Sequence, residues 1–284
     1  MAPAPPAVVP LATTWRGSGP LVVCHPGGPG MDPRYLEPLD GLADSRTVAI
    51  VHPRGAGSSP RPADGDYALE SYAADLAAWI RREAGGGPVD LLGHSHGGAV
   101  ASLTAARYPD LVRRLVLLGT PAYGGDRAEA QADAFHRARH SEAAVARALA
   151  ALEAQGDAYP ADDAGLGRLI AEVIPLWVGP MTDRLAAWQA RLAGWSANVD
   201  ALRYFNEIVF PVLHREMEHL PAVRCPTLAL AGDLDGWAGP EHVALLTESV
   251  VLGTGEVIAG AGHMCHADAT EHVLRSVRQF LYGS

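Results

Sequence analysis

A strand-like apolar run, Val89–Leu92, leads directly into the glycine-rich stretch GHSHGG, and an alanine-rich run follows. Glycine loses more backbone freedom on folding than any other residue, so this cluster of glycines needs a local reason. The spacing G-x-S-x-G between a strand and a helix is typical of a sharp turn that lifts a serine hydroxyl above the edge of a sheet. We expect Ser95 to occupy that turn, with Gly93 and Gly97 leaving room beside it. The N-terminus of the following helix would then favour negative charge near Ser95.

Six short apolar runs have the length and the Gly or Pro boundaries of buried strands, and helical patterns lie between them. The runs do not alternate between apolar and polar residues, which is typical of a parallel sheet covered on both faces. They are Leu21–Cys24, Thr47–Val51, Val89–Leu92, Leu115–Leu118, Thr227–Ala231 and Glu256–Ala259. The alternation of strands and helices predicts an α/β fold, with a mostly parallel central sheet, flanking helices and right-handed crossovers.

The alternation stops in the middle of the chain, where the sequence is helical and strand-free between residues 122 and 220. We interpret this segment as a helical cap inserted into one α/β core formed by residues 1–121 and 221–284. A separate helical domain is the weaker alternative, because the strand pattern resumes after the insertion.

Composition excludes several classes of function. The chain has 284 residues, is 48% hydrophobic and carries a formal net charge of -10, and all its basic residues are arginines scattered along the sequence. We therefore expect a sizeable core and no nucleic-acid partner. We see neither an apolar run long enough to cross a bilayer nor a signal peptide, and Cys24, Cys225 and Cys265 form an odd, sparse set. These features favour a cytoplasmic protein with free thiols and no membrane partner.

Two further polar positions follow strands, in the order that a serine nucleophile of this architecture requires. A serine hydroxyl needs a base to take its proton and a carboxylate to orient that base. We predict that His263, in the loop after Glu256–Ala259, is the base and that Asp235 is the carboxylate. Asp233 is the alternative, although it directly follows the strand Thr227–Ala231 and lies less far into the loop.

The stretch HPGGPG, residues 25–30, also follows a predicted strand. An oxyanion hole needs backbone N–H groups on a segment that can approach the substrate closely, and glycines permit such an approach. We assign one donor to the N–H of Gly28, with Gly27 as the alternative. The second donor is assigned to the N–H of His96, the residue after the serine.

These motifs together resemble the α/β-hydrolase superfamily, and more narrowly the proline iminopeptidase group of serine hydrolases. HPGGPG is similar to the oxyanion loop of that group, HPRGAGSS at residues 52–59 to its D-Q-R-G-x-G-x-S segment, and GDLD and GAGH to its acid and histidine loops. The sequence departs from the group at His52, where the group has aspartate, and at Ser196, which follows Trp195 where a glutamate is expected. The resemblance implies a serine hydrolase that forms an acyl-enzyme and needs no cofactor.

The resemblance also implies a small aminoacyl or short peptide substrate, with a cap glutamate holding the free amino group. Glu207 is the candidate glutamate, and Trp195 is the candidate apolar contact beneath the cap. The alternatives are an esterase, lactonase or thioesterase acting on a small or natural-product acyl substrate, and a lyase or cyclase that uses the same residues. We expect no metal at HMCH, residues 263–266, because its spacing is cramped and a second ligand cluster is absent from the sequence. Arg54 is expected to hold loop carbonyls, and the sequence does not predict an oligomeric state.

Overall fold

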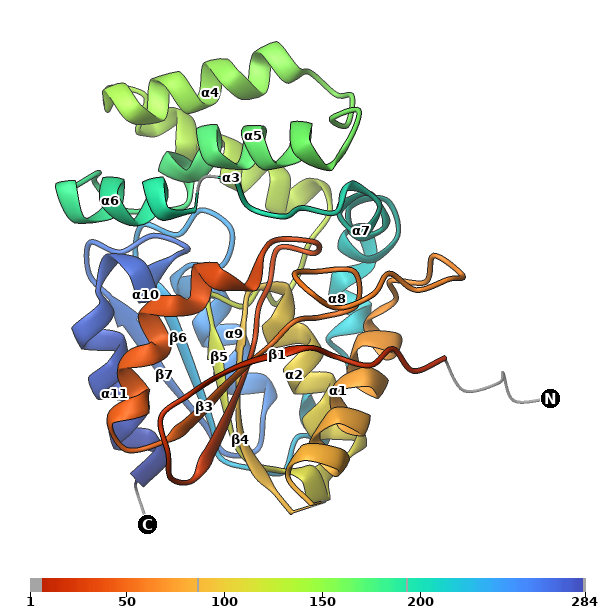
Figure 1. Ribbon diagram of the computed structural model, residues 1–284. Helices are drawn as coiled ribbons and strands as arrows, with labels where there is room; N and C mark the ends of the chain where they lie inside the picture. Colours follow the sequence, from red (N-terminus) through yellow and green to blue (C-terminus); the bar gives the residue numbers. More distant parts are fainter. Residues whose placement is uncertain (1–6, 86, 193, 283–284) are drawn as a thin grey trace.

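The computed structural model describes residues 7–85, 87–192 and 194–282, and within them the chain forms a seven-stranded sheet in the order β1-β3-β2-β4-β5-β6-β7 (Figure 1). The strands are β1 (Thr13–Arg16), β2 (Leu21–His25), β3 (Thr47–Val51), β4 (Val89–His94), β5 (Val112–Leu118), β6 (Thr227–Gly232) and β7 (Gly253–Ile258). β1 pairs antiparallel with β3, and the other pairs are parallel. The predicted α/β fold, with a mostly parallel central sheet, is therefore confirmed.

The strands differ from the prediction at the two edges of the sheet. β1 was not predicted because its four residues, TTWR, are polar or half-exposed and contain no apolar run. β7 begins at Gly253, three residues before the predicted start, and most of it is exposed. An edge strand covered on one side only does not need the continuous apolar sequence that marks a central parallel strand.

Helices cover both faces of the sheet and create two layers of apolar core. On one face lie α1 (Leu69–Glu83), α2 (His96–Arg107) and α9 (Pro240–Ser249). On the other lie the 3₁₀ helix η1 (Pro33–Asp44) and α11 (Thr270–Tyr282). Strand side chains are buried toward both layers, which explains the continuous apolar runs of the central strands. The structure describes no helix long and apolar enough to span a bilayer.

The insertion stands over the carboxyl ends of the parallel strands (Figure 1). It contains α3 (Asp126–Ala138), α4 (Ala143–Gln155), α5 (Asp163–Val173), α6 (Asp183–Arg191) and α7 (Val199–Tyr204). The next helix, α8 (Leu213–Glu216), packs instead with the α1 and α2 side of the core, where Leu213 is fully buried. The boundary at residue 220 stays a prediction, because cap helices also bury residues against this side of the core, as Ala128 of α3 and Ala201 of α7 do.

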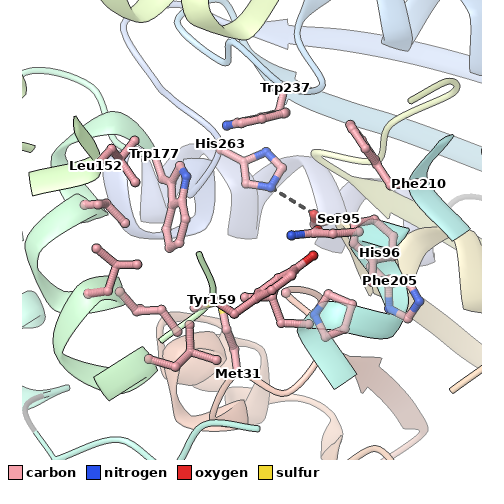
Figure 2. Close-up of a pocket in the computed structure, with 18 of the residues that line it drawn as sticks. Met31, Ser95, His96, Leu152, Tyr159, Trp177, Phe205, Phe210, Trp237 and His263 are labelled. Carbon is pink, nitrogen blue, oxygen red and sulfur yellow. Dashed lines mark hydrogen bonds between the residues drawn. The ribbon is translucent and has the colours of Figure 1, made fainter. Parts of the chain in front are cut away.

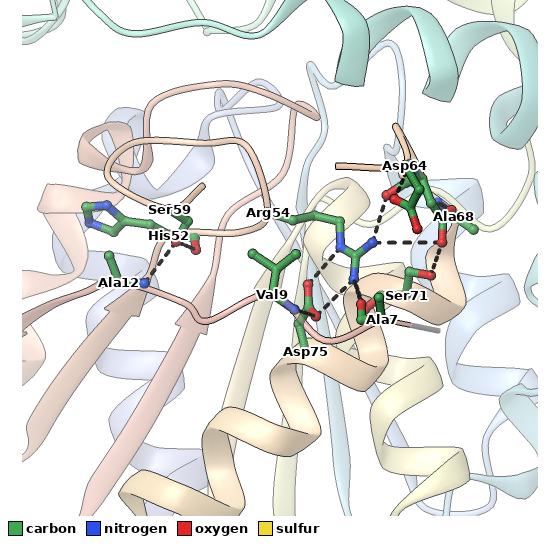
Figure 3. Close-up of polar contacts among 11 residues, drawn as sticks. Ala7, Val9, Ala12, His52, Arg54, Ser59, Asp64, Ala68, Ser71 and Asp75 are labelled. Carbon is green, nitrogen blue, oxygen red and sulfur yellow. Dashed lines mark hydrogen bonds and ion pairs between the residues drawn. The ribbon is translucent and has the colours of Figure 1, made fainter. Parts of the chain in front are cut away.

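Arg54, in the loop after β3, is buried and holds several chain segments together (Figure 3). Its guanidinium donates to both carboxylate oxygens of Asp75 on α1, at 2.7 and 2.9 Å. It also donates to the carbonyl oxygens of Ala7, Asp66 and Ser71. The Asp75 carboxylate accepts a further hydrogen bond from the Val9 N–H, 2.7 Å away. Arg54 therefore holds loop carbonyls, and through Asp75 it also holds the lead-in to β1.

Candidate active site

Ser95 lies at the turn between β4 and α2, in a strained backbone conformation. Its φ of 54° and ψ of -127° make it the only non-glycine residue with positive φ among those the structure describes. A Cβ atom on Gly97 would lie 2.4 Å from the carbonyl oxygens of His25 and Pro26, and one on Gly93 would lie 2.2 Å from the carbonyl oxygen of Gly97. Only glycine fits at these two positions. Strain of this kind, about 1–3 kcal/mol, persists where the surrounding structure enforces it and is concentrated at functional sites.

Three side chains from three different loops meet at this turn. The Ser95 Oγ lies 2.9 Å from the His263 Nε2, and the His263 Nδ1 lies 2.9 Å from the Asp235 Oδ2. Asp233 is exposed and instead accepts a hydrogen bond from the Gly260 N–H, at 2.7 Å. The structure therefore brings together Ser95, His263 and Asp235, and it directs the alternative acid, Asp233, away from His263.

The Asp235 carboxylate is buried but accepts several hydrogen bonds from protein groups. Burial alone would raise its pKa, but attraction to His263 and hydrogen bonds from His263 and from the N–H groups of Ala238 and Trp237 outweigh that effect. The pKa of Asp235 is therefore held below its ordinary value. The Oδ1 atom receives the two backbone hydrogen bonds, at 2.8 and 2.9 Å, which leaves Oδ2 for His263. An ionised carboxylate in this position fixes the Nδ1–H tautomer of His263 and leaves Nε2 free to accept the Ser95 proton.

Gly28 and His96 line the same cavity as Ser95, and their backbone N–H groups donate no hydrogen bond among the loop and turn contacts of the described residues. Gly28 has a φ of 54°, which favours glycine, and His96 is the first residue of α2. The N–H of Gly27, the alternative donor, is already used because it donates to the Tyr35 hydroxyl at 2.5 Å. The geometry therefore favours Gly28 and His96 as a pair of donors for a developing oxyanion.

Four buried histidines surround the turn: His25, His94, His96 and His266. Burial lowers the pKa of His25 to about 4 and those of His96 and His266 to about 3, and it places that of His94 well below its ordinary value. All four rings are therefore neutral at neutral pH. His266, in the HMCH stretch, lies 3.2 Å from the Tyr35 carbonyl oxygen through Nε2, while His263 faces Ser95, so the two rings serve separate partners.

A cavity of about 550 Å³ opens next to Ser95, between the cap and the sheet. One wall comes from α4, α5 and the residues after α5, and Figure 2 shows Leu152 and Trp177 on that side. The opposite wall carries Phe205 and Phe210, with Ser95 between the two walls (Figure 2). Most of the lining is apolar, and within the described residues it contains no arginine.

The sequence matches the family model described as alpha/beta hydrolase fold over residues 20–270. The chain belongs to this family. The 2-(acetamidomethylene)succinate hydrolase of Mesorhizobium japonicum is 37% identical over 108 residues, 38% of each chain. The proline iminopeptidase of Saccharolobus solfataricus is 33% identical over 104 residues, 36% of this chain and 34% of that protein. An esterase structure from Thermogutta terrifontis superposes with a TM-score of 0.69 at 23% identity, covering 96% of this chain and 93% of the other.

These comparisons confirm the predicted α/β-hydrolase superfamily. The matched regions span just over a third of the two curated relatives. They therefore leave the substrate of this hydrolase open, and that question depends on the cap.

Neither of the two cap residues predicted to bind substrate contributes to the cavity lining of the hydrolase. Glu207 lies on the π-helical turn Phe205–Val209 and is exposed, whereas its neighbours Phe205, Asn206 and Phe210 face the cavity. Trp195 is buried, and its ring packs against that of Tyr35, which itself lines the cavity. Helical spacing predicted that one face of each segment is buried, but not which face would meet the cavity.

The cavity lining also includes polar residues that the sequence did not single out: Glu129, Gln155, Asp157, Tyr159 and Asn206. Glu129 and Asp157 are exposed, so both carboxylates lie toward solvent. Tyr159 extends into the cavity (Figure 2). It lies in the connection between α4 and α5, where no periodic pattern marks a residue as inward-facing, so the sequence carried no signal for it.

Proposed function

We propose that Ser95 is the nucleophile of this hydrolase, that His263 is its general base and acid, and that Asp235 orients His263. As the Ser95 Oγ adds to the substrate carbonyl carbon, its proton passes to the His263 Nε2. The carbonyl oxygen becomes an oxyanion and accepts hydrogen bonds from the N–H groups of Gly28 and His96. Collapse of the tetrahedral intermediate breaks the bond to the leaving group, which takes the proton from His263.

Water then repeats the sequence on the acyl-enzyme. His263 accepts a proton from the water as the water oxygen adds to the acyl carbon, and it returns that proton to the Ser95 Oγ as the acid product leaves. The Ser95 Oγ and the His263 Nε2, 2.9 Å apart, are close enough for the proton transfers between them, and the Asp235 Oδ2, 2.9 Å from the His263 Nδ1, holds the ring in place for these steps.

We further propose that the substrate is an ester or thioester with an uncharged, apolar acyl chain. The observation that carries this proposal is the wall formed by α4 and α5, where Leu166, Leu169, Ile170 and Val173 face the cavity together with Trp177. Apolar walls of this kind gain free energy by excluding water from an apolar chain.

An anionic substrate is disfavoured by the same lining. Succinate, in the name of the Mesorhizobium relative, carries two carboxylates, and a buried carboxylate needs a cationic partner. The chain contains no lysine, and the described lining of the cavity contains no arginine. The two carboxylates at the opening, Glu129 and Asp157, would repel such a substrate further.

An aminoacyl substrate is the second candidate. The resemblance to iminopeptidases requires a carboxylate that holds the substrate's free amino group, and Glu129 provides a carboxylate at the cavity. Glu129 is exposed, however, and an ion pair in contact with water contributes only about 0–1 kcal/mol. A buried amine would need more than that. The lining therefore favours the acyl ester over the amine.

A substrate panel tests this proposal. It compares p-nitrophenyl acetate, butyrate and octanoate, the matching acyl thioesters of N-acetylcysteamine, and the p-nitroanilides of proline and alanine. We expect kcat/KM to rise with acyl length and to exceed that for the p-nitroanilides. If an aminoacyl anilide is the better substrate and Glu129→Gln raises its KM alone, the acyl-ester proposal is wrong and the aminopeptidase proposal replaces it.

A further inference from the structure

A chain of buried hydrogen bonds connects the loop that carries Gly28 to the loop that carries His263. It begins at the Gly27 N–H, 2.5 Å from the Tyr35 hydroxyl oxygen. The same hydroxyl lies 2.9 Å from the His94 Nδ1, and the His94 Nε2 lies 3.0 Å from the carbonyl oxygen of His263. Tyr35 and His94 are both at most 1% exposed, so water does not compete for these contacts.

The donor and acceptor in each link follow from the two ends of the chain. The His263 carbonyl oxygen can only accept, so the His94 Nε2 carries the proton and donates. A neutral His94 then has an unprotonated Nδ1 that can only accept, which makes the Tyr35 hydroxyl the donor in that link. The Gly27 N–H can only donate, and it donates to the Tyr35 oxygen. Each group therefore has one possible role, and the chain runs in one direction from Gly27 to His263.

The directions of two pKa shifts support this assignment. Burial keeps the pKa of His94 well below its ordinary value, so the ring stays neutral. Burial likewise raises the pKa of Tyr35, so the phenol keeps its proton. Both rings are also packed on each other, with centroids 5.3 Å apart, and His266 contacts both.

We propose that Tyr35 and His94 are positioning residues. They hold the loop that carries Gly28 and the loop that carries His263 in fixed positions relative to each other, on either side of Ser95. By engaging the Gly27 N–H, the Tyr35 hydroxyl fixes the Pro26–Gly27 peptide plane. That peptide directly precedes the one that carries the Gly28 N–H, which stays free for the substrate. By engaging the His263 carbonyl, His94 fixes the backbone from which the imidazole extends toward Ser95. This inference rests on the proposed roles of Ser95, His263 and Gly28.

Trp195 has a role in this arrangement that differs from the predicted one. Its ring lies 6.2 Å from that of Tyr35, between centroids, and 6.5 Å from that of Trp188 on α6. Trp195 therefore supports Tyr35 from the cap side.

The test compares two tyrosine-to-phenylalanine variants that each remove one buried hydroxyl. Tyr35→Phe should lower kcat for a p-nitrophenyl ester about tenfold to a hundredfold with KM changed less than about twofold, because a misplaced donor costs less than the hundredfold to thousandfold loss of a donor itself. The rate of covalent labelling by a fluorophosphonate should fall in parallel. Tyr72→Phe is the matched control: the Tyr72 hydroxyl is buried but has no hydrogen-bond partner in the described structure, so its removal should leave kcat unchanged.

A double-mutant cycle separates positioning from packing. His94→Gln keeps a donor near the His263 carbonyl but removes the ring acceptor for Tyr35, so it cuts the same link as Tyr35→Phe. The kcat of the double variant should therefore lie within about threefold of the kcat of the slower single variant, because the two changes are not independent. Multiplied losses, or a lowered Tm with wild-type kcat, would overturn the proposal. If Tyr35→Phe does not fold, the kcat of His94→Gln, which leaves Tyr35 in place, decides the question on its own.

The same experiments distinguish a failure of this inference from a failure of the proposed function. If Ser95→Ala is inactive while Tyr35→Phe and His94→Gln keep the wild-type kcat, only the positioning proposal is wrong. If Ser95→Ala still turns over the ester, the proposed function fails first.

Discussion

Acidification should destabilise this hydrolase steeply, because the histidines around Ser95 are buried in their neutral form. Burial lowers the pKa of His25 to about 4 and those of His96 and His266 to about 3, whereas an unfolded histidine titrates at about 6.5. Between these values the unfolded chain binds more protons than the folded protein. The free energy of unfolding is therefore intact above about pH 6.5 and falls as the pH is lowered.

The loss can be estimated for each ring. Lowering the pH from about 7 to about 5 removes about 2 kcal/mol per histidine, or about 6 kcal/mol for His25, His96 and His266 together. That is comparable to the entire stability of many domains, which is about 5–15 kcal/mol. Buried carboxylates such as Asp75 and Asp268, whose pKa values are raised by burial, stabilise the folded protein as the pH falls. The contribution of the histidines to the free energy of unfolding must therefore be separated with variants.

His96→Met isolates one ring. The His96 Nε2 has no hydrogen-bond partner in the described structure, and the ring packs between Tyr72 and Phe205, so methionine removes the titration and keeps an apolar contact. Urea unfolding, followed by tryptophan fluorescence, measures the free energy of unfolding at about pH 7 and about pH 5. The loss between the two pH values should be about 2 kcal/mol smaller for His96→Met than for the wild type. His214→Gln, at an exposed position, serves as the control and should follow the wild type. If wild type and His96→Met lose stability in parallel, the buried-histidine explanation is refuted.

Three further changes test other parts of the structure. Asp235→Asn should lower kcat by about four orders of magnitude, as loss of the orienting carboxylate does in serine proteases, while Asp233→Asn stays close to wild type; the reverse order would contradict the assignment of the acid. Arg54→Met should cost about 3–5 kcal/mol in urea unfolding by leaving Asp75 buried without its partner, and adding Asp75→Leu should restore part of that loss. Leu169→Trp should narrow the cavity at its apolar wall, so that kcat/KM falls for an octanoyl ester and stays unchanged for the acetyl ester. An equal effect on both esters would place the acyl chain elsewhere.

The core of the molecule could be predicted because its physical requirements are local in the sequence. β3 and β6 are buried on both faces, and that requirement leaves continuous apolar runs; the buried β4 departs from this only at Asp90, which is paired with Arg46 and Arg113. The turn at Ser95 needs glycines at fixed offsets because backbone oxygens occupy the space beside it. Asp235 and His263 follow successive strands, and parallel strands end at the same edge of the sheet.

The cap could not be predicted to the same depth. Its helices are amphipathic, but the position of each helix over the sheet depends on long-range packing that no local pattern records. Glu207 and Phe205 are two residues apart, which places them about 200° apart around a helix, so one is exposed and the other lines the cavity. The sequence pattern did not tell which of the two sides would meet the cavity. Tyr35 likewise gave no signal, since its importance lies in contacts with Gly27 and with His94, 59 residues away along the chain.

Covalent labelling at Ser95 tests the central claim most directly. The protein is treated with a fluorophosphonate, digested, and analysed by mass spectrometry alongside Ser95→Ala. We expect one adduct, on the peptide that contains Ser95. Ser95→Ala should lose this adduct, and its ester turnover should fall at least about a thousandfold. An adduct on another residue, or a Ser95→Ala variant that hydrolyses the ester at a rate near that of the wild type, would contradict the account.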